Sequence, residues 1–132
     1  MHRSPLVPEL SVRDLQHSRR FYVDGIGFTV AYARSAPDFL YLDLNGAQLM
    51  IEEDHDDGWM TGSDAAARGI GMNLQIEVSD IERSVAGLTS LRVQAFRPLT
   101  TVTYETVDGP LTQREYLAQD PDGYLIRLIQ RQ

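Results

Sequence analysis

Histidine has the widest chemical range of any residue type in this chain of 132 residues, and it occurs only at His2, His17 and His55. Cysteine and lysine are absent, since all 12 basic residues are arginine. Thiolate nucleophiles, thiolate zinc sites, Schiff-base chemistry and phosphate-loop lysines are therefore excluded. Catalysis or metal binding by histidine would have to use these three side chains, and their spacing indicates no Ser-His-Asp arrangement.

The most charged stretch, residues 52–58, ends beside the single tryptophan, Trp59. Its carboxylates could bind a cation. The stretch does not match a calcium-binding loop, because its glycine falls one place early and Ala65 occupies the position of the closing glutamate. We interpret it as a solvated acidic loop that carries an exposed His55 and adds negative potential to its surroundings.

The charge balance restricts the partners of the protein. The chain has 19 acidic residues and a net charge of −7, with a pI near 4.8. An acidic surface repels phosphate backbones and anionic lipid headgroups, whereas it attracts cationic ligands. No apolar run approaches the roughly 20 residues of a membrane span, and there is no apolar core of a signal peptide. We expect a cytoplasmic protein that binds neither nucleic acid nor a membrane.

The two halves of the chain share one pattern. Residues 8–18 align with residues 74–84 at an offset of half the chain. Asp14 and Asp80 each stand where a strand of alternating polarity changes to a helical period, which is the position of an N-cap acceptor. Each half is therefore predicted to begin with a strand followed at once by a helix.

Strands follow each predicted helix. In the first half we expect them at residues 28–34, 39–44 and 47–52, with a tight hairpin at Asn45-Gly46. In the second half we expect them at residues 93–97, within 101–118 and at 124–130, with turns at 107–110 and 120–123. The order β-α-β-β-β in each half predicts an α+β fold.

This order also predicts the domain organisation. One domain is expected over residues 1–132, and it divides into module 1 at about 5–53, a linker at 54–69 and module 2 at about 70–131. Proline at positions 5 and 8 suits an edge or crossing position for the first strand, because proline lacks a backbone donor.

Alternation along the predicted strands separates two faces. Leucine and isoleucine residues point to one face, beneath the helices. The opposite face carries polar and aromatic side chains, among them Phe39, Tyr41, Glu52, Asn73, Gln75 and Glu77. Because this face is not uniformly charged, we interpret it as the lining of a ligand cleft.

Two segments give the chain a resemblance to a known group. Residues 12–28 are similar to the first helix and second strand of the vicinal-oxygen-chelate superfamily, which includes glyoxalases, bleomycin-resistance proteins and extradiol dioxygenases. Asp120-Pro-Asp-Gly-Tyr-Leu-Ile126 opens the closing strand as that superfamily does. The resemblance implies paired βαβββ modules whose curled mixed sheets form a cleft, often completed by dimerisation.

Enzymes of that superfamily hold a divalent metal with histidine and glutamate ligands on the cleft face. The matching positions here are Val7, Asn73 and Arg127. Valine cannot ligate, asparagine is a weak neutral ligand and a guanidinium repels a dication, so Glu52 remains alone. This departure favours a protein without a cofactor and without catalysis. The alternative is a metal-dependent or metal-free enzyme of the superfamily, such as a lyase, isomerase, transferase or dioxygenase.

Four further segments are similar to the bleomycin-resistance type of this superfamily. They are residues 46–53, 59–62, 73–78 and 113–116. This implies an antibiotic-sequestering homodimer that binds a bleomycin-like or other flat cationic small molecule stoichiometrically. The expected cleft residues are Phe39, Tyr41, Glu52, Trp59, Asn73, Gln75, Glu77, Tyr104, Tyr116 and Arg127.

Several of these assignments have a second interpretation. Trp59 is either a core plug or a ligand platform, and Tyr104 and Tyr116 could pack in the core or line the cleft. Arg127 is expected to pair with an acid such as Glu77 or Glu115, or to recognise a carboxylate or carbonyl group of the ligand.

Overall fold

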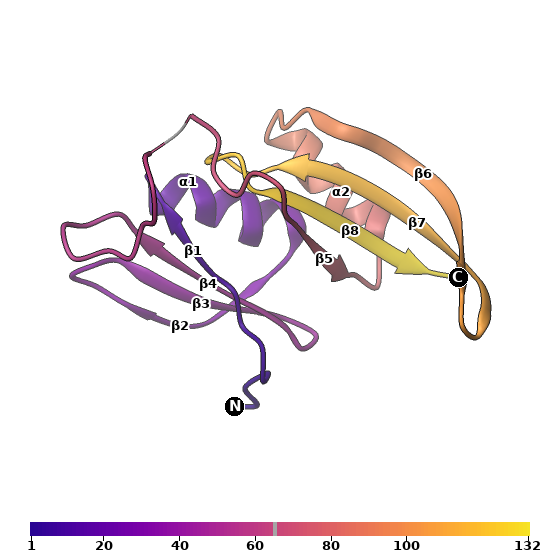
Figure 1. Ribbon diagram of the computed structural model, residues 1–132, viewed down its shortest axis with the longest axis horizontal. Coiled ribbons are helices and arrows are strands. Elements are labelled where there is room, and N and C mark those ends of the chain that lie inside the picture. Colours follow the sequence, from indigo (N-terminus) through magenta and orange to yellow (C-terminus); the bar gives the residue numbers. More distant parts are fainter. Residues whose placement is uncertain (65) are drawn as a thin grey trace.

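A computed structural model describes residues 1–64 and 66–132, and Figure 1 shows its elements in chain order. Module 1 contains β1 (Glu9–Val12), α1 (Leu15–Arg19), the π-helical segment η1 (Arg20–Ile26), β2 (Thr29–Arg34), β3 (Phe39–Leu44) and β4 (Ala47–Glu53). Module 2 contains β5 (Asn73–Glu77), α2 (Ile81–Ser90), β6 (Ala95–Thr106), β7 (Gly109–Gln119) and β8 (Leu125–Arg131).

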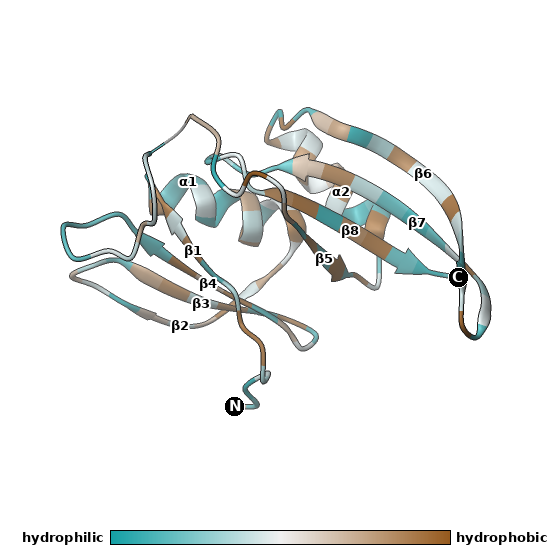
Figure 2. Ribbon diagram, in the orientation of Figure 1, coloured by the Kyte–Doolittle hydropathy of each residue, from teal (hydrophilic) through white to brown (hydrophobic). Residues whose placement is uncertain are grey.

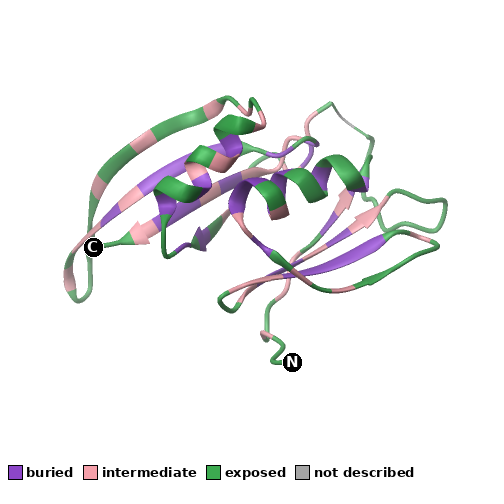
Figure 3. Cartoon of the chain, turned by 180° about the vertical axis from the view of Figure 1, so that it is seen from behind, coloured by how far each residue is buried: buried purple, intermediate pink, exposed green. Residues whose placement is uncertain are grey.

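The strands form two separate four-stranded mixed sheets with the same topology. Their orders are β1-β4-β3-β2 and β5-β8-β7-β6. In each sheet the first strand pairs parallel to the last strand of its module, and the other pairs are antiparallel. The helices lie side by side over one face of the sheets, as the view from behind shows (Figure 3). This arrangement confirms the predicted α+β fold with paired βαβββ modules.

Both predicted helix starts are present. The carboxylate of Asp14 accepts hydrogen bonds from the backbone N–H groups of Gln16 and His17. The carboxylate of Asp80 accepts one from the N–H of Arg83. Each carboxylate satisfies donors that the first turn of a helix leaves unpaired, so the internal repeat has a local physical cause.

The sequence predicted two strands where the structure has one long strand. Residues 93–97 and a stretch within 101–118 were expected as separate strands, but residues 95–97 and 101–106 belong to the single strand β6. Register shifts against β7 occur between Ala95 and Arg97 and between Arg97 and Thr100. Pro98 lies inside this interval and has no backbone donor, which explains the local break in an otherwise continuous strand.

The core lies between the helices and the sheets. Val12, Ile51, Ile81 and Leu88 are fully buried there. Apolar segments gather on β3 and β8, whereas the loop after β4 is hydrophilic (Figure 2). The helices approach each other closely, since a Cβ atom on Gly87 would lie 2.2 Å from the carbonyl oxygen of Gly25. No helix among the described residues is long and apolar enough to cross a bilayer.

A buried carboxylate joins the two modules. Asp120 Oδ2 accepts a hydrogen bond of 2.7 Å from the hydroxyl of Tyr22 on η1. Asp120 Oδ1 accepts from the backbone N–H groups of Asp122 and Tyr124 and thereby shapes its own turn. Burial raises the pKa of Asp120 to about 6, above its usual value of 3.8, although these hydrogen bonds oppose the rise.

The same turn makes two more contacts with module 1. Asp122 Oδ1 accepts from the backbone N–H of Arg13 at 3.1 Å. The hydroxyl of Tyr124 donates to the carbonyl oxygen of Ser11 at 3.0 Å. The Asp-Pro-Asp-Gly turn therefore fixes the end of β1 and the start of α1 relative to module 2.

The raised pKa of Asp120 predicts a pH dependence of stability. Between pH about 4 and 6, Asp120 keeps its proton in the folded state and loses it in the unfolded chain. The contribution of Asp120 to the free energy of unfolding is therefore full below pH about 4 and is lost as pH rises through about 6. The gap between the two pKa values corresponds to about 3 kcal/mol. In Asp120→Asn, the uncharged amide oxygen can still accept from the backbone.

The free energy of unfolding of the natural chain, minus that of Asp120→Asn, should fall by up to about 3 kcal/mol between pH 4 and 7, measured by urea denaturation. Asp108→Asn in the exposed β6–β7 turn controls for the loss of one negative charge. A difference that does not change with pH would contradict the prediction.

Candidate functional site

The sheet faces turned away from the helices carry most of the residues expected in a cleft. On the first sheet, the strand register places four side chains in each of two rows across β1, β4, β3 and β2. The first row is Glu9, Met50, Tyr41 and Tyr32, and the second is Ser11, Glu52, Phe39 and Arg34. The alternation predicted for β3 and β4 is confirmed by these rows.

The aromatic part of these rows is covered by its neighbours. Tyr32 stacks on Tyr41 with ring centroids 5.0 Å apart, and the Arg34 guanidinium lies 3.9 Å from the centroid of Phe39. Phe39 and Tyr41 are only 1% and 3% exposed. They lie on the expected face, but the expectation that they form an open lining is wrong, because side chains of β2 cover them.

The open part of this face adjoins the linker. A cavity of about 470 Å³ lies between β1 and residues 59–70, and its walls include Glu9, Ser11, Trp59 and Tyr124. Trp59 is 90% exposed, so it is not a core plug. Its indole is available at the wall of this cavity, which we call the linker cavity.

A smaller acidic cavity shares Ser11, Met60 and Arg68 with the linker cavity. Its volume is about 210 Å³, and its walls carry the acidic side chains of Glu52, Glu53, Asp54 and Asp64. His55 also lines it, with Nε2 2.7 Å from a carboxylate oxygen of Glu52.

Glu9 extends this negative region into the linker cavity. Partial burial raises the pKa of Glu9, and the nearby Glu52 carboxylate raises it further, while Arg34 opposes the rise. A partly buried carboxylate beside a second carboxylate indicates a place where a cation would be stabilised.

Arg68 fastens the linker to β1. Its side chain is 6% exposed, and it donates two hydrogen bonds to the carboxylate of Asp54, at 3.0 and 2.7 Å. It also donates to Asp64 and to the carbonyl oxygen of Ser11. These bonds raise the pKa of Arg68 above its usual value, with the hydrogen bond to Asp54 the largest cause. The guanidinium therefore holds the linker residues against the cavity.

The corresponding face of the second sheet is closed by its own side chains. Glu115 is 1% exposed and accepts hydrogen bonds from Tyr104 and Gln113. Arg127 forms an ion pair with Glu115 at 3.7 Å, which confirms one of its two expected partners. The hydrogen bond to Glu115 raises the pKa of the Tyr104 hydroxyl. The other expected partner, Glu77, pairs with Arg131 instead.

The expected site residues of module 2 are dispersed. Asn73 and Gln75 are exposed on the expected face, but neither they nor Arg127 belong to the walls of the two cavities. For Tyr116, core packing and cleft lining were both open, and the structure has the first. Tyr116 pairs with Leu128 and packs in the core.

Sequence comparison identifies the family of this chain. Residues 6–128 match the profile of the Glyoxalase/Bleomycin resistance protein/Dioxygenase superfamily. The chain belongs to this superfamily. A bleomycin resistance protein from Geobacillus stearothermophilus and one from Staphylococcus aureus are each 27% identical to it over 134 residues, covering 95% of both chains.

Solved structures of the superfamily fold are similar over nearly the whole length. TioX from Micromonospora sp. ML1 gives a TM-score of 0.69 at 20% identity, covering 98% of this chain and 99% of its own. The fosfomycin resistance protein FosX from Listeria monocytogenes gives 0.67 at 14% identity, covering 100% and 96%. At these identities the likeness establishes the fold alone.

The superfamily's metal does not fit the residues present. Val7 precedes β1 and offers no donor atom, and Arg127 brings a positive charge to the third ligand position. Glu52 is engaged with His55. Within residues 1–64 and 66–132, no group of three or more histidine or carboxylate side chains is arranged to hold a metal ion.

Sequence reasoning missed several residues of the two cavities. Ser11 and Glu9 alternate with Leu10 and Val12, so the period of β1 could have placed them on the cleft face. Met60, Arg68 and Tyr124 lie in segments without periodicity, and only the folded linker brings them to the cavity.

The role of Arg68 predicts a loss of stability on its removal. Arg68→Ala removes the hydrogen bonds from a buried guanidinium to Asp54, Asp64 and Ser11, so the free energy of unfolding should fall by about 1–3 kcal/mol. Arg68→Lys should recover less than half of this loss, because an ammonium cannot reproduce the planar two-pronged contact. Urea denaturation measures both, with exposed Arg19→Ala as control. Full recovery by lysine would show that charge alone matters.

Proposed function

We propose that this protein sequesters a flat, cationic small molecule of the bleomycin class by stoichiometric binding. The observation that carries the proposal is the position of Trp59, which is 90% exposed beside a cavity that also contains Glu9. An exposed aromatic face next to a carboxylate suits a ligand that combines flat rings with positive charge.

The size of the linker cavity supports this ligand class. Its volume of about 470 Å³ lies within the range of pockets that hold small molecules, roughly 300–1,000 Å³. Met60 contributes a flexible apolar side chain, and Ser11 and Tyr124 contribute polar atoms that can orient a ligand. A ring system stacked on Trp59 would extend over these groups.

Electrostatics support a cationic ligand. The walls of the two cavities carry five carboxylates, at Glu9, Glu52, Glu53, Asp54 and Asp64. Arg68 is the one arginine among those walls, and its charge is already paired with Asp54 and Asp64. The net charge of −7 adds a long-range attraction that accelerates the capture of a cation.

The comparisons support a binding role over catalysis. The two relatives reported above are named for bleomycin resistance, and the proposal brings that role to this chain. The unsuitable donor set at the superfamily's metal positions removes the usual means of catalysis on this fold, which is why binding without chemistry is the preferred function.

A cytoplasmic homodimer is part of the proposal. Leu6 and Ile70 are 81% and 83% exposed, and Met72 is 49% exposed. A second subunit that covers these apolar side chains would remove them from water and close the open part of the first sheet's face over the ligand.

Substitutions at the cavity test the proposal. Trp59→Ala should weaken binding of bleomycin by about 1–3 kcal/mol, because it removes a stacking anchor. Glu9→Gln should weaken bleomycin binding less than Trp59→Ala does. In the natural chain, added salt should slow association more than dissociation, and Glu9→Gln should reduce this effect of salt. Stopped-flow fluorescence of Trp59, with calorimetry for Trp59→Ala, measures these changes.

Val107→Ala is the matched control, because Val107 is a fully exposed apolar residue on the distant β6–β7 turn. Equal affinity in the natural chain, Trp59→Ala and Val107→Ala would exclude the linker cavity as the binding site.

A further inference from the structure

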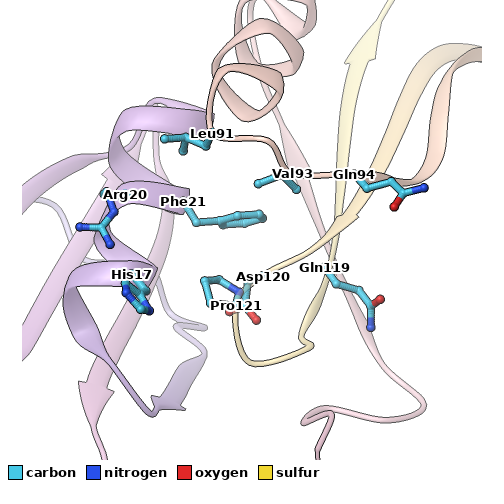
Figure 4. A pocket seen from close by; sticks show the side chains of 9 residues that line it. All are labelled: His17, Arg20, Phe21, Leu91, Val93, Gln94, Gln119, Asp120 and Pro121. Carbon is cyan, nitrogen blue, oxygen red and sulfur yellow. The ribbon is translucent and has the colours of Figure 1, made fainter.

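The helix side of the molecule has a pocket that the proposed function does not use. It has a volume of about 370 Å³ and lies between the first helical region, the end of α2 and the turn before β8 (Figure 4). Module 1 contributes His17, Arg20 and Phe21, and module 2 contributes Val93, Gln119 and Pro121 among others. We call it the helix-side pocket.

The polarity of this pocket is ordered along its length. His17 and Arg20 lie at one end, and Gln94 and Gln119 lie at the other (Figure 4). The ring of Phe21, which is 2% exposed, lies between them with Val93 and Pro121 on either side. The surface thus offers the Arg20 guanidinium and the His17 imidazole at one end, an apolar middle and neutral amides at the other end.

The walls of the pocket carry one arginine, Arg20, and one carboxylate, Asp120, so the pocket lacks the acidic excess of the linker cavity and its neighbour. Arg20 takes part in none of the ion pairs found among residues 1–64 and 66–132. The carboxylate in the wall, Asp120, is 5% exposed, and its two oxygens already accept three hydrogen bonds. Nε2 of His17 lies 3.6 Å from a carboxylate oxygen of Asp14. Arg20 is therefore the cation that remains available to a ligand.

From this geometry we propose that the helix-side pocket binds a small aromatic monocarboxylate. Its carboxylate would accept hydrogen bonds from Arg20 and His17, and its ring would lie against Phe21, Val93 and Pro121. The site is separate from the linker cavity, which is acidic and would repel the same ligand. A bound acid would contact both modules at the turn that joins them.

The experiment uses 2-naphthoate and its uncharged analogue 2-naphthamide as probes. Amide shifts in two-dimensional NMR are followed during titration of the intact protein. Naphthoate should shift the amide signals of residues 17–21, 91–94 and 119–120 saturably, and it should bind more tightly than naphthamide. Arg20→Gln should weaken naphthoate binding by roughly two- to fivefold and leave naphthamide unchanged.

Arg19→Gln is the matched control, since Arg19 is the neighbouring exposed arginine and does not line the pocket. An equal loss in Arg19→Gln and Arg20→Gln would overturn the proposal, because it would reflect net charge alone. Shifts centred on Trp59 and Glu9, or the absence of saturable shifts at millimolar naphthoate, would overturn it as well. None of these results depends on the binding of a cationic ligand in the linker cavity.

Discussion

The Asp-Pro-Asp-Gly turn at residues 120–123 is the constraint on which the rest of the arrangement depends. Its first carboxylate is buried against Tyr22, its second accepts from the backbone of Arg13, and Tyr124 directly after it reaches Ser11. The carbonyl oxygen of Asp122 also accepts from the N–H of Arg68 at 2.9 Å. One short segment therefore positions both modules, the linker and the walls of both proposed sites. The cost of burying Asp120 is offset by three hydrogen bonds, which is why the turn tolerates a group of raised pKa.

The repeated module has diverged into two chemically different sheet faces. In module 1 the face is acidic and aromatic, and it opens beside the linker at Glu9 and Ser11. In module 2 the corresponding face is closed by the ion pair of Arg127 with buried Glu115 and by the hydroxyl of Tyr104. Internal duplication explains the common backbone, while local side-chain chemistry decides which half can receive a ligand.

Local signals in the sequence predicted most of the backbone and only part of the site. Asp14 and Asp80 predict the helix starts because an N-cap contacts residues at most three positions away. Asn45-Gly46 predicts the hairpin turn, and both residues have the positive φ that this turn requires. The covering of Phe39 by Arg34 depends on the register of the β2–β3 hairpin, and the burial of Arg68 depends on Ser11, which is distant in sequence. Periodicity reports neither of these. The choice between core and cleft for Tyr116 depends on its pairing with Leu128 across β7 and β8, which local periodicity does not report.

The most direct test of the account is calorimetric titration of the purified protein with bleomycin, with the compound recovered and analysed afterwards. The account predicts saturable binding near one ligand per chain, quenching of Trp59 fluorescence with the same affinity, and recovery of the compound unchanged. Chemical conversion of the compound, or the absence of saturable binding, would contradict it.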